Sequence, residues 1–106
     1  MKTPGALEVD VLLVVARHDD EAYGLLVREE VSGARGRQYS VGAIYTTLSR
    51  LEAKGLLSSR TTEPLPIRGG RSRRQYRLTA AARTVLAAER ERTLRRWTSV
   101  PQWGQA

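Results

Sequence analysis

The sequence predicts a mainly α-helical domain with one small β-hairpin, and three observations support that expectation. Within the first 55 positions, apolar residues recur at helical spacing in three short segments. Two strand-like segments follow, and a basic turn containing Gly69-Gly70 separates them. The last segment is rich in Ala, Arg and Glu, which have high helix propensity, so we expect a final helix.

The first helix is expected over Leu7–Arg17, where Leu and Val recur at helical spacing. The Val-rich composition leaves a strand as the alternative. Glu8 and Asp10 favour the helix, because acidic residues in a first turn complement the positive end of the helix dipole.

A second helix is expected over about Glu21–Val31, capped by Asp19 or Asp20 and stopped by Gly33. Residues 33–37 would then form a loop with two exposed cations. The predicted apolar face of this helix consists of Tyr23, Leu26, Val27 and Val31.

The third helix is expected to begin at Ser40, whose side chain can accept a backbone N–H of the first turn, and to end at Gly55 in a left-handed conformation. Its inward residues recur at helical spacing and are Ile44, Leu48 and Leu51.

The hairpin is expected to run out from Leu56-Leu57 to about Thr62 and to return over Arg73–Leu78, where alternate residues face opposite sides. The two prolines of residues 63–67 exclude that stretch from a central strand. Thr79 then caps the last helix, expected over about Ala80–Trp97, and Pro101 prevents a longer one.

Charge and composition narrow the classes of partner. The chain has 106 residues, enough for one domain, and a net charge of +7 that favours polyanions, nucleic acid before anionic membrane. Only two of the 18 basic residues are Lys. Arginine suits forked contacts with phosphate and guanine, but a GC-rich genome gives the same composition, so both explanations stay open.

Several other classes are not expected. The absence of Cys excludes disulfides and cysteine-based zinc sites, and the lone His18 beside Asp19 and Asp20 is expected to be an exposed helix-end residue rather than a metal ligand. No nucleophile partners His18, so we expect neither an enzyme nor a cofactor. The run Val11–Ala16 is too short for a membrane span, and Met1–Pro4 starts no signal peptide, so a cytoplasmic protein is expected.

The outer face of the third helix suits entry into the major groove. Small residues permit close approach there, and hydroxyl and guanidinium groups can contact base edges or phosphates. Taken alone, this helix favours the simpler interpretation, which is an ordinary amphipathic surface helix. The outer residues are Gly42, Ala43, Thr46, Thr47 and Arg50.

The turn of the hairpin makes nucleic acid the favoured partner. Its glycines let the backbone approach a phosphate, and its arginines can follow a phosphate strand or enter a narrow minor groove. In isolation such a charge run is compatible with a solvated turn. Around Gly69-Gly70 the arginines are Arg68, Arg71, Arg73, Arg74 and Arg77.

Five motifs in this order resemble the PadR family of bacterial transcriptional regulators over residues 5–97. They are Tyr23-Gly24, Gly42-Ala43-Ile44-Tyr45, the run 48–57, Gly69-Gly70-Arg71 and the run 76–79. The resemblance implies a winged helix-turn-helix over residues 1–78, a dimerisation helix over 79–98 and a tail over 99–106. It also implies sequence-specific binding of double-stranded DNA, as a dimeric repressor.

The resemblance further implies which residues lie at the DNA. Tyr45 would contact a phosphate through its hydroxyl, although a core position beside Ile44 stays open as the alternative. The sequence departs from the family at Leu25-Leu26-Val27 in the second helix, and at Ala43 and Thr46, where the family usually has Thr and Pro. The expected DNA-binding residues are Ser40, Gly42, Ala43, Tyr45, Thr46, Thr47, Arg50, Arg68, Gly69, Gly70, Arg71 and Arg73.

A homodimer would place two third helices about 34 Å apart and require a pseudo-palindromic operator. Trp97 and Trp103 could form an aromatic pocket for a small-molecule effector. Dimer packing by Trp97, with Trp103 in the tail, is favoured because paired aromatic residues at an interface need no ligand. The expected interface residues are Leu7, Val11, Val85, Leu86, Leu94 and Trp97.

Two other functions stay open. Winged helices also serve as protein-interaction modules without specific DNA binding. RNA binding is the weaker alternative, because the sequence shows no aromatic platform on which bases could stack.

Overall fold

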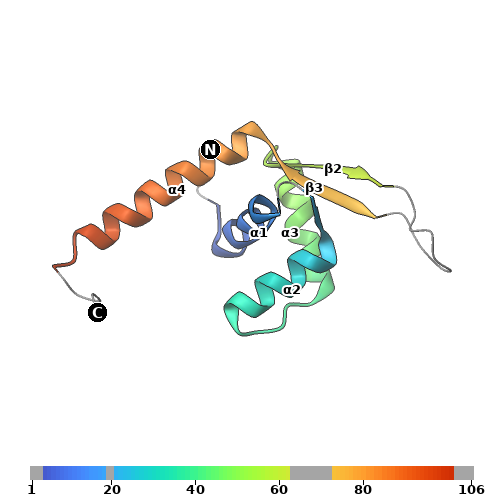
Figure 1. Cartoon of the computed structure of the whole chain (residues 1–106), viewed down its shortest axis with the longest axis horizontal. Coiled ribbons are helices and arrows are strands. Elements are labelled where there is room, and N and C mark those ends of the chain that lie inside the picture. Colours follow the sequence, from blue (N-terminus) through green and yellow to red (C-terminus); the bar gives the residue numbers. More distant parts are fainter. Residues whose placement is uncertain (1–3, 19–20, 63–72, 102–106) are drawn as a thin grey trace.

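The structure is a computed structural model that describes residues 4–18, 21–62 and 73–101. Figure 1 shows a helical body, a hairpin that leaves it on one side and a long last helix that leaves it on the other. A mainly helical fold with a small antiparallel sheet was predicted and is confirmed. The elements are α1 (Ala6–Arg17), β1 (Ala22–Tyr23), α2 (Gly24–Arg35), α3 (Val41–Ala53), β2 (Leu57–Thr61), β3 (Arg74–Leu78) and α4 (Ala80–Thr98).

The first helix forms as predicted, because its apolar residues fall on one helical face. Val11, Leu12, Val14 and Val15 are at most 1% exposed and form the centre of the core. A strand would have directed successive members of this run to opposite sides. The strand alternative for this Val-rich segment is therefore wrong.

The second helix differs from the prediction at both ends. It begins at Gly24 rather than Glu21, because Ala22 and Tyr23 pair with Tyr76 and Gln75 as the short strand β1. It also passes through Gly33 and ends at Gly36, whose φ of 66° is the left-handed conformation that glycine adopts without steric cost. The predicted loop over residues 33–37 is accordingly helical as far as Arg35, and the predicted caps Asp19 and Asp20 lie outside the described residues.

The third helix forms as predicted. The Ser40 hydroxyl accepts the backbone N–H of Ala43 at 3.0 Å, and Gly55 has a φ of 75° just after the helix ends. Ile44, Leu48 and Leu51 are fully buried. The position of α3 is therefore fixed by a cap at one end and an apolar face along its length.

The sheet has three strands in the order β1-β3-β2, all antiparallel. The predicted hairpin of β2 and β3 is present, with Leu57 opposite Leu78 and Thr61 opposite Arg74. β1 was not predicted, because two residues are too few to show the alternation that identifies a strand. It makes β3 the central strand.

Thr79 joins the end of α3 to the start of α4. Its hydroxyl accepts the backbone N–H of Ala82 at 3.2 Å and donates to the carbonyl of Gly55 at 2.7 Å. Its own N–H donates to the carbonyl of Leu56 at 3.2 Å. The predicted cap is thus confirmed and has a second role, since it sets the direction in which α4 leaves the body.

Replacing Thr79 with Ala is expected to lower the free energy of unfolding by about 1–2 kcal/mol, because a helix cap and a carbonyl contact are both lost. Thr84→Ala on the same helix is the matched control, since its exposed hydroxyl only meets the carbonyl of Ala80. Urea unfolding would measure both variants. Equal losses for the two would show that Thr79 has no special role at this junction.

Candidate nucleic-acid interface

The exposed side of α3 is a shallow, open surface. A hollow is lined by Gly42, Tyr45, Thr46, Ser49, Arg50 and Ala53, which recur at three- and four-residue intervals. This set, which we call the α3 outer face, includes Ser49 and Ala53, which sequence reasoning missed. Ser49 lies three residues after Thr46, and Ala53 lies four residues after Ser49. This helical spacing would have placed both on the same face.

Of the other predicted residues on this helix, Ser40 is exposed at the capped end and Ala43 is half-buried. The prediction that Thr47 lies on the outer side is wrong. Thr47 is 6% exposed, and its hydroxyl donates to the carbonyl of Ala43 at 2.9 Å. The physical reason is spacing: Thr47 lies three residues after Ile44 and four before Leu51, on the helix side that packs into the core.

Tyr45 lies at the edge of the α3 outer face, against the first turn of α2. The residue is 39% exposed. A Cβ atom at Gly24 would lie 2.4 Å from the Tyr45 hydroxyl oxygen, so the ring occupies the space that a side chain at Gly24 would need. The core position that the sequence left open is therefore not adopted, and contact of the hydroxyl with phosphate stays a prediction.

The structure describes only some of the arginines that were predicted around the turn of the hairpin. Arg68, Gly69, Gly70 and Arg71, the predicted tip, lie outside the described residues. Arg73 is exposed, and its guanidinium lies 5.3 Å from the centre of the Tyr23 ring. This contact directs Arg73 toward the β1 edge of the sheet.

Ion pairs fix both helices of the helix-turn-helix to α1. Lys54 Nζ lies 2.6 Å from Glu8 Oε2 at the end of α3, and Arg35 Nε lies 2.5 Å from Asp10 Oδ2 at the end of α2. The hydrogen bond from Lys54 lowers the pKa of Glu8, and the Asp10 carboxylate raises the pKa of Arg35. The ends of α2 and α3 are thereby held to one common helix.

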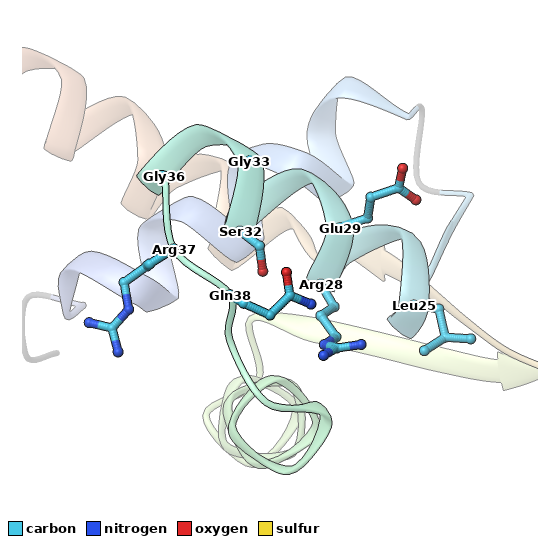
Figure 2. Close-up of a pocket in the computed structure, with 8 residues that line it drawn as sticks. All are labelled: Leu25, Arg28, Glu29, Ser32, Gly33, Gly36, Arg37 and Gln38. Carbon is cyan, nitrogen blue, oxygen red and sulfur yellow. The ribbon is translucent and has the colours of Figure 1, made fainter.

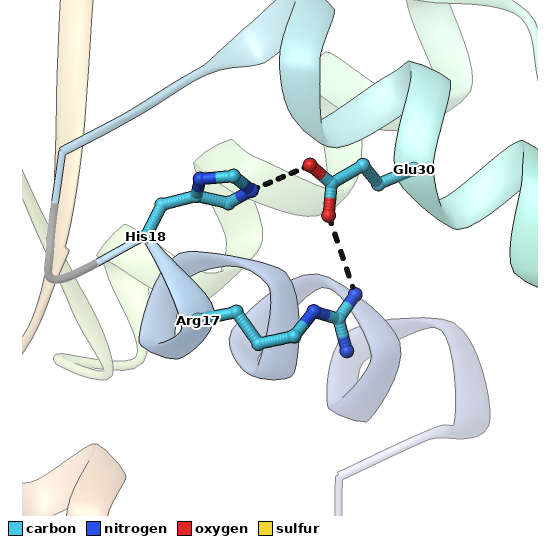
Figure 3. Close-up of polar contacts among 3 residues, drawn as sticks. All are labelled: Arg17, His18 and Glu30. Carbon is cyan, nitrogen blue, oxygen red and sulfur yellow. Dashed lines mark hydrogen bonds and ion pairs between the residues drawn. The ribbon is translucent and has the colours of Figure 1, made fainter.

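His18 belongs to a third contact of this kind (Figure 3). Its Nε2 atom lies 2.5 Å from Glu30 Oε2, and Arg17 lies 3.5 Å from the other oxygen of the same carboxylate. The His18 side chain is half-buried between α1 and α2. The prediction that it is exposed is therefore wrong. Within the described ranges, no three His, Asp or Glu residues gather as a metal site would require.

A second surface lies between α1 and α4. A hollow of about 460 Å³, which we call the α1–α4 groove, has an apolar lining of Val9, Leu13, Leu86, Ala87 and Leu94. Leu13 is 42% exposed and was missed by sequence reasoning, although it follows Val9 at helical spacing. No helix in the described part of the chain is long and apolar enough to cross a membrane.

The residues predicted for the dimer interface differ in how far they are exposed. Val11 is fully buried in the core of its own chain, so its assignment to an interface is wrong. Leu7, Val85 and Leu86 pack partly against that core, whereas Leu94 and Trp97 are 47% and 57% exposed. The aromatic pocket that the sequence left as the alternative is not described, because Trp103 lies outside the described residues.

Comparisons with known proteins agree with this fold. The model of the transcriptional regulator PadR-like family matches residues 11–88. The transcriptional regulator Rv3488 of Mycobacterium tuberculosis is 42% identical over 72 residues, which are 68% of this chain and 63% of that relative.

Solved structures have the same architecture. A PadR-like transcriptional regulator from Bacillus cereus has a TM-score of 0.75 at 22% identity, with 96% of this chain and 94% of that one covered. A PadR-like transcription factor from Bacteroides fragilis has a TM-score of 0.69 at 27% identity, with 88% and 84% covered.

Gly24→Ala is expected to lower the free energy of unfolding by about 1–3 kcal/mol, because the added methyl group displaces the Tyr45 ring. In a Tyr45→Ala background the same substitution should be neutral or stabilising, since the space is then empty. Urea unfolding of the four proteins measures this coupling. An equal effect of Gly24→Ala in both backgrounds would exclude the proposed contact.

Proposed function

We propose a function from one premise, namely that this chain belongs to the PadR-like family of transcriptional regulators. In this proposal the protein binds double-stranded DNA sequence-specifically, with α3 in the major groove. The observation that carries it is the α3 outer face, an exposed surface of small, hydroxylated and cationic residues on a helix whose opposite face is fully buried.

The chemistry of this face fits base recognition. Gly42 adds no side chain near the start of α3, so the backbone can come close to base edges. Thr46 can exchange hydrogen bonds with base edges, and Arg50 offers the fork that matches guanine. Tyr45 is positioned at the rim, where its hydroxyl can donate to a phosphate.

The hairpin supplies the remaining contacts of the proposal. Arg68, Gly69, Gly70 and Arg71 are assigned to the DNA backbone on sequence grounds, and Arg73 belongs to the same basic segment of the sequence. Their role is charge and position rather than recognition of bases.

We also propose that two copies associate through the α1–α4 groove. Ala82 is the one buried residue of the 19-residue α4 helix, which leaves most of its length without cover from its own chain. Leu13 and Leu94 border the groove and expose apolar area that a second copy would bury. A dimer on a pseudo-palindromic operator would repress by occluding the promoter, and binding of a small-molecule effector would change the spacing of the two α3 helices.

The direct test of DNA binding is fluorescence anisotropy with the gene's own upstream region and with random duplex at moderate salt. The wild-type protein is expected to prefer the upstream region. Arg50→Ala should reduce that preference by a factor corresponding to about 1–3 kcal/mol, because a base contact is lost. Arg96→Ala, an equal charge change on exposed α4, should leave it unchanged. No preference by the wild-type protein would reject the proposal and would favour a protein-interaction module.

The dimer is tested by placing one charge on each of two exposed leucines. Leu13→Asp is expected to shift the protein toward monomer in analytical ultracentrifugation, because a carboxylate would be buried in an apolar interface. Leu25→Asp, on α2 and 62% exposed, is the matched control and should not change the mass. If the wild-type protein is a monomer, or if Leu13→Asp remains a dimer, the proposed interface is wrong.

A further inference from the structure

We propose that a cleft along α2 binds a phosphate of the DNA backbone beside the site that α3 recognises. The cleft has a volume of about 670 Å³ and lies between α2 and the segment 36–38. Its polar lining includes Arg28, Ser32, Arg37 and Gln38 (Figure 2). The inference rests on the proposed DNA binding and adds a contact outside the predicted set.

Tyr39 holds both arginines of the cleft in place. Arg28 Nε donates to the Tyr39 carbonyl at 2.7 Å, which orients the guanidinium and leaves its two terminal nitrogens for another acceptor. The Arg37 guanidinium lies 4.8 Å from the centre of the Tyr39 ring. Tyr39 is itself fixed, since its N–H donates to the Ser32 hydroxyl at 3.1 Å.

These arginines differ from their neighbours in charge pairing. Arg17, Arg35 and Lys54 each have a carboxylate partner on a neighbouring helix. Within residues 4–18, 21–62 and 73–101, neither Arg28 nor Arg37 forms an ion pair.

Glu29 also lines the cleft, but Figure 2 shows its carboxylate on the side of α2 away from Arg28 and Arg37. An oriented guanidinium group without a carboxylate partner is suited to phosphate, which accepts its hydrogen bonds in forked geometry. Figure 2 shows Arg28 and Arg37 on opposite sides of Gln38, so each offers its own contact along the cleft.

The cleft is continuous with the proposed recognition helix. The segment that carries Arg37 and Gln38 leads directly to Ser40, the cap of α3, and Figure 2 shows α3 end-on below it. A phosphate in the cleft therefore lies near the end of α3 that enters the groove. Such a contact sets the position of the protein on the duplex and carries no sequence information.

The test compares three single substitutions that each remove one positive charge. Arg28→Ala and Arg37→Ala should each weaken binding to the upstream region and to random duplex by the same factor, roughly tenfold. Each should also lower the slope of log affinity against log salt by roughly 0.9 per protomer. Arg96→Ala is the matched control, because it removes the same charge from exposed α4, does not line the cleft and should leave both affinities and the slope unchanged.

The outcomes separate this inference from the proposed function. If the wild-type protein does not prefer the upstream region, the proposed function fails. If it does, and Arg37→Ala has the same salt slope as Arg96→Ala, the phosphate site is rejected. A change of sequence preference in Arg37→Ala would also overturn the assignment, since a phosphate contact cannot cause one. Should Arg28→Ala lower stability in thermal unfolding, the exposed Arg37 decides the test.

Discussion

The structure depends on burial of one face of α1. Val11, Leu12, Val14 and Val15 are almost completely inaccessible, and the helix contacts α2, α3, β3 and α4. Because each of these elements has too little apolar surface to form a core alone, α1 is the common surface on which they assemble. α2 and α3 are positioned by how they pack on this helix, whereas α4 is positioned by its contacts with α1 together with the Thr79 junction.

The other faces of α1 extend its role beyond the core. Its acidic residues Asp10 and Glu8 contact the ends of α2 and α3, and its apolar residues Val9 and Leu13 border the α1–α4 groove. The same helix therefore contacts the elements of the proposed DNA surface and lines the proposed dimer surface.

Pairing of charges divides the arginines into two groups. Those that join helices, such as Arg17 and Arg35, meet carboxylates and contribute to packing. Arg28 and Arg37 instead contact the carbonyl and ring of Tyr39, which orient the guanidinium without neutralising it. The net charge of +7 does not distinguish these groups. An oriented guanidinium group without a carboxylate partner is the more specific sign of where a polyanion is expected to bind, beside Arg50 on the α3 outer face.

Local chemistry determined much of the fold in advance. Ser40 and Thr79 cap their helices, Gly55 ends α3, and the spacing of Ile44, Leu48 and Leu51 fixed the buried face, because all of these effects act within a few residues of the chain. The family was also accessible from sequence, since its motifs are contiguous.

Only the tertiary structure decided the features that depend on distant partners. Ala22 and Tyr23 became a strand because β3, more than 50 residues later, offers them hydrogen bonds. Val11 proved to be buried within its own chain, by elements that its own sequence neighbourhood does not specify. The hydrophobic pattern shows that a residue prefers burial. When a helix such as α1 has two apolar faces, however, the packing of other elements determines which face the same chain covers and which face remains exposed.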